Sequence, residues 1–527
     1  MKLDTILENA TVVTLDGERP TGTRVGIWQG RIVGVDEQIE GMDATDIVDL
    51  AGATVLPGFI DAHTHLQLTG QGMLAVNVSA ARTPEAALAI IAEAAHDRPA
   101  DAWVEVSGYD QREIGRDLTA SELQVAAGGR KVWARHISSH SSVVSTTVLD
   151  AIPDQSRRDD PEIGAGLFKE LDQALVHSQR LPYSLDDAGR TITIAAEAAR
   201  REGVTFCMEA GAGGRLGSLN NLDISTYLRL MENGPLPVRM QLMPSRDVLH
   251  PVKGGAHDGF VRGLDVGLRT GFGSDMLQLG AMKITLDGGM MVRTARLTKP
   301  YADGTELGEY SDDPAAMIAD IVDAHVAGWQ LAVHAIGDAA IDVAIDAFTA
   351  CAAAAPMTRR HRIEHGGYIR NDQIAPLAAL DIAIVSQPSF LYDSGDDFAA
   401  QLGAERVHGL YRGKSLLDAG IRIVGSTDRP LSGTPLRIIQ SLVDRTSSRG
   451  TVVGDGEQIG VADALATITT HGAWIAGMED RLGKVRSGFL ADLTILGANP
   501  LDTATDAIAA IPVHATVVDG RLVEVAQ

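Results

Sequence analysis

Short apolar runs rich in β-branched residues alternate along most of the chain with alanine-rich stretches of helical period, such as TPEAALAIIAEAAHD and DAAIDVAIDAFTACAAAAP. This alternation is typical of βα units that build a parallel sheet. Eight buried parallel strands predict an α/β protein with a (β/α)8 TIM barrel. The eight runs occupy residues 53–63, 203–209, 237–244, 280–288, 330–337, 361–366, 381–389 and 421–428.

Two regions do not follow the alternation and predict further parts of the fold. Residues 67–199 have helices and strands of their own, such as DAWVEVSGYD and RKVWARHISSH, and are expected to form an α/β insertion that covers the barrel mouth. Residues 1–56 and 482–527 both carry alternating strand patterns, so we expect one composite β-sandwich from the two ends. The barrel then comprises residues 57–66 and 200–481.

Side chains suited to metal binding lie at the ends of the predicted strands. His63 ends the first run and His65 follows it, while His334 lies in the fifth, His365 in the sixth and Asp428 ends the eighth. Alternate residues of a strand share a face, so His63 and His65 point the same way. Neutral imidazoles and a carboxylate suit Zn²⁺ or a similar divalent ion, and TIM barrels carry their reactive groups at the C-terminal strand ends. A single histidine is more often a packed or surface residue, and the agreement among these positions favours a metal site.

Lys283 stands in the fourth run, among apolar residues of the segment GAMKITLDGG. Burial disfavours an ammonium and lowers its pKa. One interpretation is a lysine paired with Asp287 or another acid. The other is a neutral amine that adds CO₂ and becomes a carbamate, a carboxylate surrogate able to bridge two cations.

The charge of the chain argues against anionic partners. The formal net charge is −24, and the sequence has no basic patch, so nucleic acid and membrane surfaces are not expected to bind. The N-terminal segment MKLDTILENATVVTLDG lacks the pattern of a signal peptide, and only two cysteines occur, so we expect a cytoplasmic protein without a disulfide framework. A homodimer stays open.

Several segments together resemble the amidohydrolase superfamily, and within it the amidohydrolase-3 branch of YtcJ-like proteins and N-substituted formamide deformylase. The resemblance covers nearly the whole chain and implies a binuclear, most simply zinc-dependent, hydrolase. In the family pattern His63 and His65 hold the more buried metal, and a carboxylated Lys283 bridges the two ions. His334 and His365 hold the second metal, while Asp428 binds metal and handles the proton. The matching segments are LPGFIDAHTHL, MKITLDGG, VHAIGDAAIDVAIDAF, RIEHGGY, VSQPSF, GKVRSGFLADLTIL, GYDQREI and RHISSHSSVVSTTVLDAI.

The activity implied by this resemblance is hydrolysis of a C–N amide-type bond by a metal-activated hydroxide. The substrate would be a small amide, with N-substituted formamides or other acyl amides as the leading class. His140, in the segment ISSHSS of the insertion, is a candidate donor to the carbonyl oxygen or its oxyanion, and the alternative is a structural histidine. Asp428 would act as general base and then as general acid.

Substrate contacts are weaker predictions. Tyr109, Gln387, Tyr392 and Arg429 are candidates, although each is equally well a packing or solvated polar residue. Arg429 stands out because the segment STDRP places it beside the acid, where relatives commonly show SD. Two other functions stay open: a histidine-metal deaminase or cyclic amidase of the same superfamily, and a metal-free barrel with a binding or regulatory role.

Overall fold

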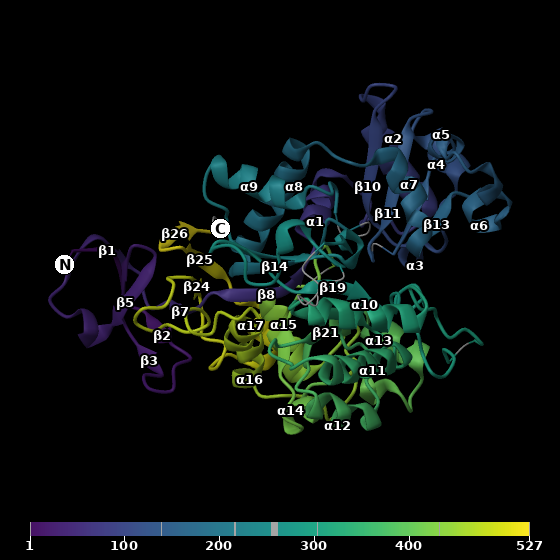
Figure 1. The fold of residues 1–527 in the computed structure, drawn as a ribbon. Coiled ribbons are helices and arrows are strands. Elements are labelled where there is room, and N and C mark those ends of the chain that lie inside the picture. The colour runs from purple at the N-terminus through teal and green to yellow at the C-terminus, as the bar shows by residue number, and fades with distance from the viewer. Residues whose placement is uncertain are drawn as a thin grey trace.

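The computed structural model describes residues 2–138, 140–214, 218–253, 262–302, 304–431 and 433–525. Two parallel sheets form its centre (Figure 1). One has the order β18-β15-β14-β8 and the other the order β19-β20-β21-β22-β23. The strands span Phe59–Thr64 (β8), Val204–Ala212 (β14), Arg239–Pro244 (β15), Leu277–Leu279 (β18), Met282–Thr285 (β19), Leu331–Ala335 (β20), Arg362–His365 (β21), Ala383–Ser386 (β22) and Ile423–Gly425 (β23).

The two sheets approach each other at both edges. A parallel bridge joins Ser245, just after β15, to Lys283 in β19. At the other edge the backbone N–H of Asp428 donates to the carbonyl of His63 over 3.0 Å. The fold is therefore α/β and TIM-barrel-like, and each of the eight apolar runs contains one of its parallel strands.

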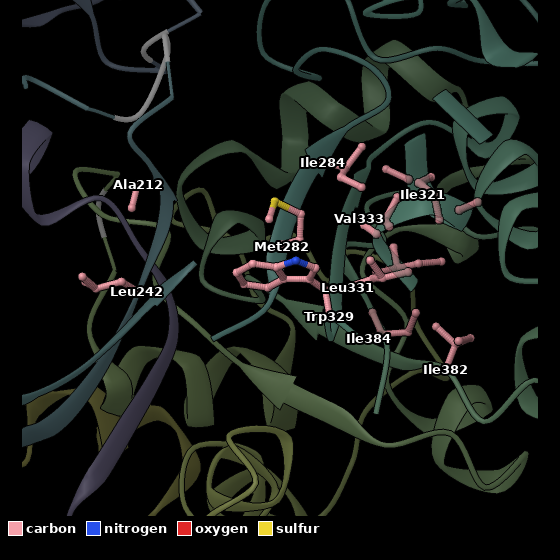
Figure 2. Packing of buried hydrophobic residues seen from close by; sticks show 14 of the residues in the cluster. Ala212, Leu242, Met282, Ile284, Ile321, Trp329, Leu331, Val333, Ile382 and Ile384 are labelled. Carbon is pink, nitrogen blue, oxygen red and sulfur yellow. The ribbon is translucent and has the colours of Figure 1, made fainter. Parts of the chain in front are cut away.

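Helices pack against these strands through apolar residues that belong to the largest buried cluster. In α10 (Pro314–Val326) the side chain of Asp313 accepts a hydrogen bond from the Ala316 N–H at 3.0 Å, and Pro314 occupies the first turn, which fixes where the helix starts. Figure 2 shows Ile321 of α10 near Val333 of β20 and Ile284 of β19, within the largest buried cluster. The other helices of this part are α8 (Leu185–Arg201), α9 (Asp223–Glu232), α11 (Asp338–Ala354), α12 (Asn371–Ala379), α13 (Phe390–Leu402), α14 (Lys414–Asp418), α15 (Pro435–Asp444), α16 (Val461–Thr467) and α17 (Thr470–Ile475).

Residues 67–199 hold a sheet of their own, with the order β13-β12-β11-β10-β9, which lies to one side of the parallel strands (Figure 1). Its strands are Val76–Asn77 (β9), Trp103–Tyr109 (β10), Lys131–His136 (β11), Ser141–Val144 (β12) and Leu167–Lys169 (β13), with α1 (Leu66–Leu74), α2 (Pro84–His96), α3 (Gln111–Ile114), α4 (Ala120–Ala126), α5 (Thr146–Ala151), α6 (Pro161–Gly164) and α7 (Gln173–Arg180) around them. One element crosses the predicted boundary at residue 199. Helix α8 begins at Leu185 and ends at Arg201, and its buried residues Ile192, Ala195 and Ala199 belong to the same cluster as the parallel strands, because its apolar stripe faces them.

Strands from the two ends of the chain pair in one sheet of order β26-β25-β24-β7-β2-β3. In its centre β7 (Thr54–Pro57) runs antiparallel to β24 (Leu493–Leu496), with Pro57 opposite Leu493. A second sheet, β5-β4-β1-β6, shares a hydrophobic cluster with the first, so the two sheets pack face to face. The remaining strands are Lys2–Glu8 (β1), Thr11–Val13 (β2), Thr21–Gly22 (β3), Val25–Trp28 (β4), Arg31–Val35 (β5), Asp43–Asp49 (β6), Val513–Val518 (β25) and Arg521–Glu524 (β26). Among the helices described, none combines the length and the apolar character needed to cross a bilayer.

Candidate metal and catalytic site

His63, in β8, lies at the centre of a cluster of titratable side chains. Its Nε2 is 3.2 Å from Nζ of Lys283 and 3.5 Å from Oδ1 of Asp428, while its Nδ1 is bonded to the carboxylate of Glu364. Burial lowers the pKa of His63 to about 4, so the imidazole is neutral at physiological pH. A neutral imidazole whose Nδ1 is held by a carboxylate has its Nε2 lone pair free for a cation.

His365 and Asp428 bring two further donors to His63, and both have backbone conformations that L residues rarely adopt. Their φ angles are 71° and 53°. Such conformations are unfavourable and concentrate at functional sites. Ligand atoms of His63, His365 and Asp428 all lie within 4.8 Å of one another. Three buried neutral or anionic donors at that spacing are suited to a divalent cation.

His65 adds a fourth candidate ligand, since its Nε2 is 3.4 Å from Oδ1 of Asp428. Its Nδ1 is buried and has no hydrogen-bond partner among the described residues. Burial opposes the charge of Asp428, but the imidazoles of His63 and His65 keep its pKa below the usual value, so the carboxylate stays ionised. The donors present fit a bound metal both in chemistry and in protonation state.

Lys283 and His334 lie on the other side of the cluster. Burial lowers the pKa of Lys283 to about 8, although Glu364 and Asp428 counteract this. The neighbour of its Nζ is His63, whereas Asp287 accepts backbone N–H bonds from Ile336 and Gly337 at 3.0 and 2.8 Å. The ring of His334 is 4.4 Å from that of His365, measured between centroids. The six predicted ligands, which come from five strand ends, therefore meet at one place.

Two buried ionic contacts that sequence reasoning missed support these ligands. Glu364, which holds His63, is 2.7 Å from Nε of Arg362, and both side chains are fully buried. Burial opposes the charge of Glu364, but Arg362 and His63 lower its pKa to about 2. The signal was present in the run HRIEHG, where two oppositely charged residues alternate within an apolar strand and must face the same interior side.

The residues predicted to contact substrate have other partners in the structure. Arg429 turns away from the cluster, because its guanidinium lies 3.4 Å from Asp61 and 2.7 Å from Glu202. Tyr109 is buried in the core of the insertion, where its hydroxyl bonds Asp117. Neither residue lines the cavities described next.

Gln387 and Tyr392 also have other partners. The Gln387 Oε1 is 2.7 Å from Nδ1 of His365, and its amide donates to Ser426 at 2.8 Å, so it orients a candidate ligand. The guanidinium of Arg437 lies over the ring of Tyr392, with its Cζ 3.9 Å from the ring centroid. Neither residue lines the two cavities.

Two cavities meet at the cluster. One has a largely apolar wall that includes Met290, Phe390, Phe398 and Tyr411. The other is more polar and runs past Ser245, Arg246 and Glu309. Both are lined by His65, His140, Glu170, Lys283 and Thr285. A ligand in either cavity therefore reaches the candidate metal ligands.

His140, which comes from the insertion, lines both cavities. Its Nδ1 is 2.9 Å from Oε2 of Glu170, and its ring is 6.5 Å from that of His334 between centroids. Burial disfavours the imidazolium, but Glu170 raises the pKa of His140 above its ordinary value. Glu170 was not anticipated, because its proximity depends on the pairing of β12 with β13.

Comparisons with known proteins agree with this geometry. The family model described as amidohydrolase family matches residues 46–524. The putative amidohydrolase YtcJ of Bacillus subtilis is 27% identical over 92% of this chain and 91% of its own. N-substituted formamide deformylase of Arthrobacter pascens is 26% identical over 98% of each chain. An uncharacterized metal-dependent hydrolase from Pyrococcus furiosus has the same fold, with a TM-score of 0.73 and 26% identity over 94% of this chain and 100% of that one.

Proposed function

Because the chain belongs to the amidohydrolase family, we propose that it is a metal-dependent hydrolase of a C–N amide-type bond in a small molecule. The observation that carries the proposal is the buried cluster in which ligand atoms of His63, His365 and Asp428 lie within 4.8 Å of one another. The solved relative from Pyrococcus furiosus is also described as a metal-dependent hydrolase. We take zinc as the first candidate ion, because imidazole and carboxylate donors suit it.

We infer that the eight strands β8, β14, β15, β19, β20, β21, β22 and β23 close into one barrel, which would direct all predicted ligands to a single mouth. His63, His65 and Asp428 would hold one ion, His334 and His365 a second, and a carboxylated Lys283 would bridge the two. When bound, the cations supply Lewis-acid polarisation of the carbonyl and make water a stronger acid. The composite sandwich and the insertion complete the proposed domain division.

Lys283 supports the bridge because its environment favours the neutral amine that carboxylation needs. With a pKa of about 8 it has a substantial neutral fraction at physiological pH, which an ordinary lysine at 10.5 lacks. The neutral amine nitrogen attacks CO₂, so that one N–C bond forms as one C–O π bond breaks, and one N–H proton is released to solvent. The product carries a negative charge where an ammonium would repel cations.

We assign the proton transfer to Asp428. Its carboxylate is ionised and lies 3.5 and 3.4 Å from His63 and His65, so a water held near these imidazoles is within its reach. As general base the carboxylate takes the proton of the attacking water, and as general acid it delivers that proton to the leaving nitrogen. His140, whose ring lies 6.5 Å from that of His334 between centroids, would donate to the carbonyl oxygen.

The substrate class rests on the cavity and on one relative. The largely apolar wall of the first cavity, which includes Met290, Phe390 and Phe398, suits a small and largely apolar organic substrate. The relative from Arthrobacter pascens, matched over 98% of both chains, is an N-substituted formamide deformylase. We therefore place N-substituted formamides first among acyl amides. The cytoplasmic location and any homodimer remain predictions.

Amine release from a panel of amides tests the proposal. The purified protein, loaded with Zn²⁺ in bicarbonate buffer, is offered N-alkyl and N-aryl formamides, the matching acetamides, carbamoyl compounds and cyclic amides, with ammonia release from amidine rings as the deaminase arm. We expect turnover of at least one acyl amide and its loss on chelation. Ammonia release alone would favour the deaminase, and absence of both tight metal and turnover would favour the binding barrel.

A further inference from the structure

The segment of the insertion that faces the cavities presents a histidine and a glutamate side by side. Strands β12 and β13 are antiparallel with Ser141 opposite Lys169, and this register brings the preceding and following residues, His140 and Glu170, together. The Glu170 N–H donates to the carbonyl of His140 over 2.9 Å. Both residues line the two cavities that meet at the candidate metal ligands.

The carboxylate of Glu170 joins the insertion to the loop after β19. Its oxygens are 2.9 and 3.1 Å from Nδ1 of His140, and Oε1 also accepts a hydrogen bond from the Thr294 hydroxyl at 2.6 Å. Thr294 in turn accepts a hydrogen bond from the Gly289 N–H at 2.9 Å. The imidazole of His140 is thus fixed with reference to the loop that carries Gly289.

Two backbone details indicate that this arrangement is specific. Glu170 has a φ of 44°, in the left-handed region that favours glycine, yet it carries the side chain that holds His140. At Gly289 an added Cβ would lie 3.2 Å from Nε2 and 3.1 Å from Cδ2 of His140. Glycine at 289 therefore leaves room for the edge of the imidazole.

We propose that Glu170 is a positioning residue that fixes the orientation of His140, so that the Nε2–H of His140 donates a hydrogen bond to the carbonyl oxygen of the bound amide as that oxygen gains negative charge. This inference rests on the proposed amide hydrolysis and assigns to the insertion a part in its chemistry. With Nδ1–H directed to Glu170, the orientation of Nε2 is set before substrate arrives. No proton changes place between His140 and the oxygen; the hydrogen bond strengthens as charge develops.

The raised pKa of His140 supports the assignment, because the imidazolium carries a hydrogen on both nitrogens. Burial alone would favour the neutral ring, and the carboxylate of Glu170 outweighs it. A charged donor makes a stronger hydrogen bond to an oxyanion than a neutral one does.

The test compares Glu170→Gln, His140→Asn and the double variant in the metal-loaded full-length protein. Glu162→Gln is the matched control, since it makes the same change on an exposed carboxylate of the insertion that pairs with Lys169. We expect Glu170→Gln to lower kcat by about 10- to 100-fold, the scale seen when a residue that orients a functional group is lost. KM and bound metal should stay near their wild-type values, because neither His140 nor Glu170 is a candidate metal ligand. Binding of a tetrahedral phosphonamidate analogue should weaken by the same factor as kcat/KM.

The double variant separates positioning from a general structural effect. Once His140 is replaced, removing the Glu170 carboxylate should bring little further loss, because the two groups act as one unit. Equal losses from Glu170→Gln in the wild-type and His140→Asn backgrounds, or a wild-type kcat in Glu170→Gln, would overturn the proposal. A wild-type protein that hydrolyses no amide would instead refute the proposed function.

A second variant covers the case in which Glu170→Gln fails to fold. Gly289→Ala keeps both partners and displaces the imidazole edge, and Gly17→Ala is its control because a Cβ there meets nothing within 4 Å. We expect loss of kcat in the first variant and none in the second. Full activity of Gly289→Ala, in a protein with an unchanged melting temperature, would refute the assigned orientation of His140.

Discussion

Lys283 should lower the stability of the metal-free protein, although we expect the protein to need this residue to bind its metal ions. The pKa of its ammonium falls from 10.5 to about 8 on folding, chiefly because of burial. Each pKa unit corresponds to about 1.4 kcal/mol, so the buried ammonium should lower the free energy of unfolding by about 3 kcal/mol below pH 8. Replacing Lys283 with methionine keeps a linear side chain of similar length and removes the buried charge.

The sign of the pH dependence follows from proton counting. Between about pH 8 and 10.5 the unfolded chain binds the lysine proton and the folded chain does not. Stability of the metal-free wild type therefore rises with pH through this window, and the full cost of the ammonium applies below it. Lys283→Met should lose this dependence.

The assay is thermal unfolding of chelated protein in CO₂-depleted buffer at pH 7 and pH 10. Unfolding entropies of about 2.1 cal/mol/K per residue give a gain of about 3 °C for Lys283→Met at pH 7 if the chain unfolds as one unit, and a smaller gain at pH 10. Lys414→Met, at an exposed lysine of α14, is the control and should change little. Metal content after zinc loading should fall in Lys283→Met alone. A metal-free variant less stable than wild type at pH 7 would refute the assignment of a costly buried ammonium.

Three further predictions concern residues around the cluster. Asp428→Asn should lower kcat by about 10²- to 10⁴-fold with metal retained, measured by steady-state kinetics and metal analysis, and near-normal turnover would remove it from proton transfer. Glu364→Gln should weaken zinc binding by about 10- to 100-fold in chelator competition, because His63 loses the carboxylate that orients it; unchanged affinity would contradict this. Arg429→Ala should cost about 3 to 5 kcal/mol of stability in denaturant unfolding and leave KM unchanged, because it strips Asp61 of its buried partner. A raised KM with normal stability would instead place Arg429 at the substrate.

The sequence predicted the parallel strands and the meeting of the candidate ligands for a physical reason. Apolar runs followed by helices leave little choice of topology, and parallel strands bring their C-terminal ends to one side. His63 and His365 could therefore be placed together without knowing any contact. Asp428 followed in the same way from its position after the last run.

Contacts that depend on how separate parts pack could not be predicted so well. Tyr109 and Arg429 looked like substrate contacts because they are polar and near predicted strand ends, but their partners Asp117 and Glu202 come from segments whose packing a local pattern does not determine. Glu170 was missed for the same reason. Glu364 is a different case. It alternates with Arg362 in one predicted strand, and this pattern alone indicates a buried ion pair.

The sheet shared by the two ends of the chain has a consequence for biosynthesis. The backbone N–H of Phe59 donates to the hydroxyl of Thr494, a residue 435 positions further along the chain. At the usual synthesis rate of about 5 to 20 residues per second, the first strands wait about 20 to 90 s before their partner β24 is made. During that interval β7 presents an unpaired, apolar edge, which is the kind of segment that chaperones cover and that aggregates when left exposed. The yield of folded protein should therefore depend on translation speed and on chaperone supply more steeply than the stability of the finished molecule would suggest.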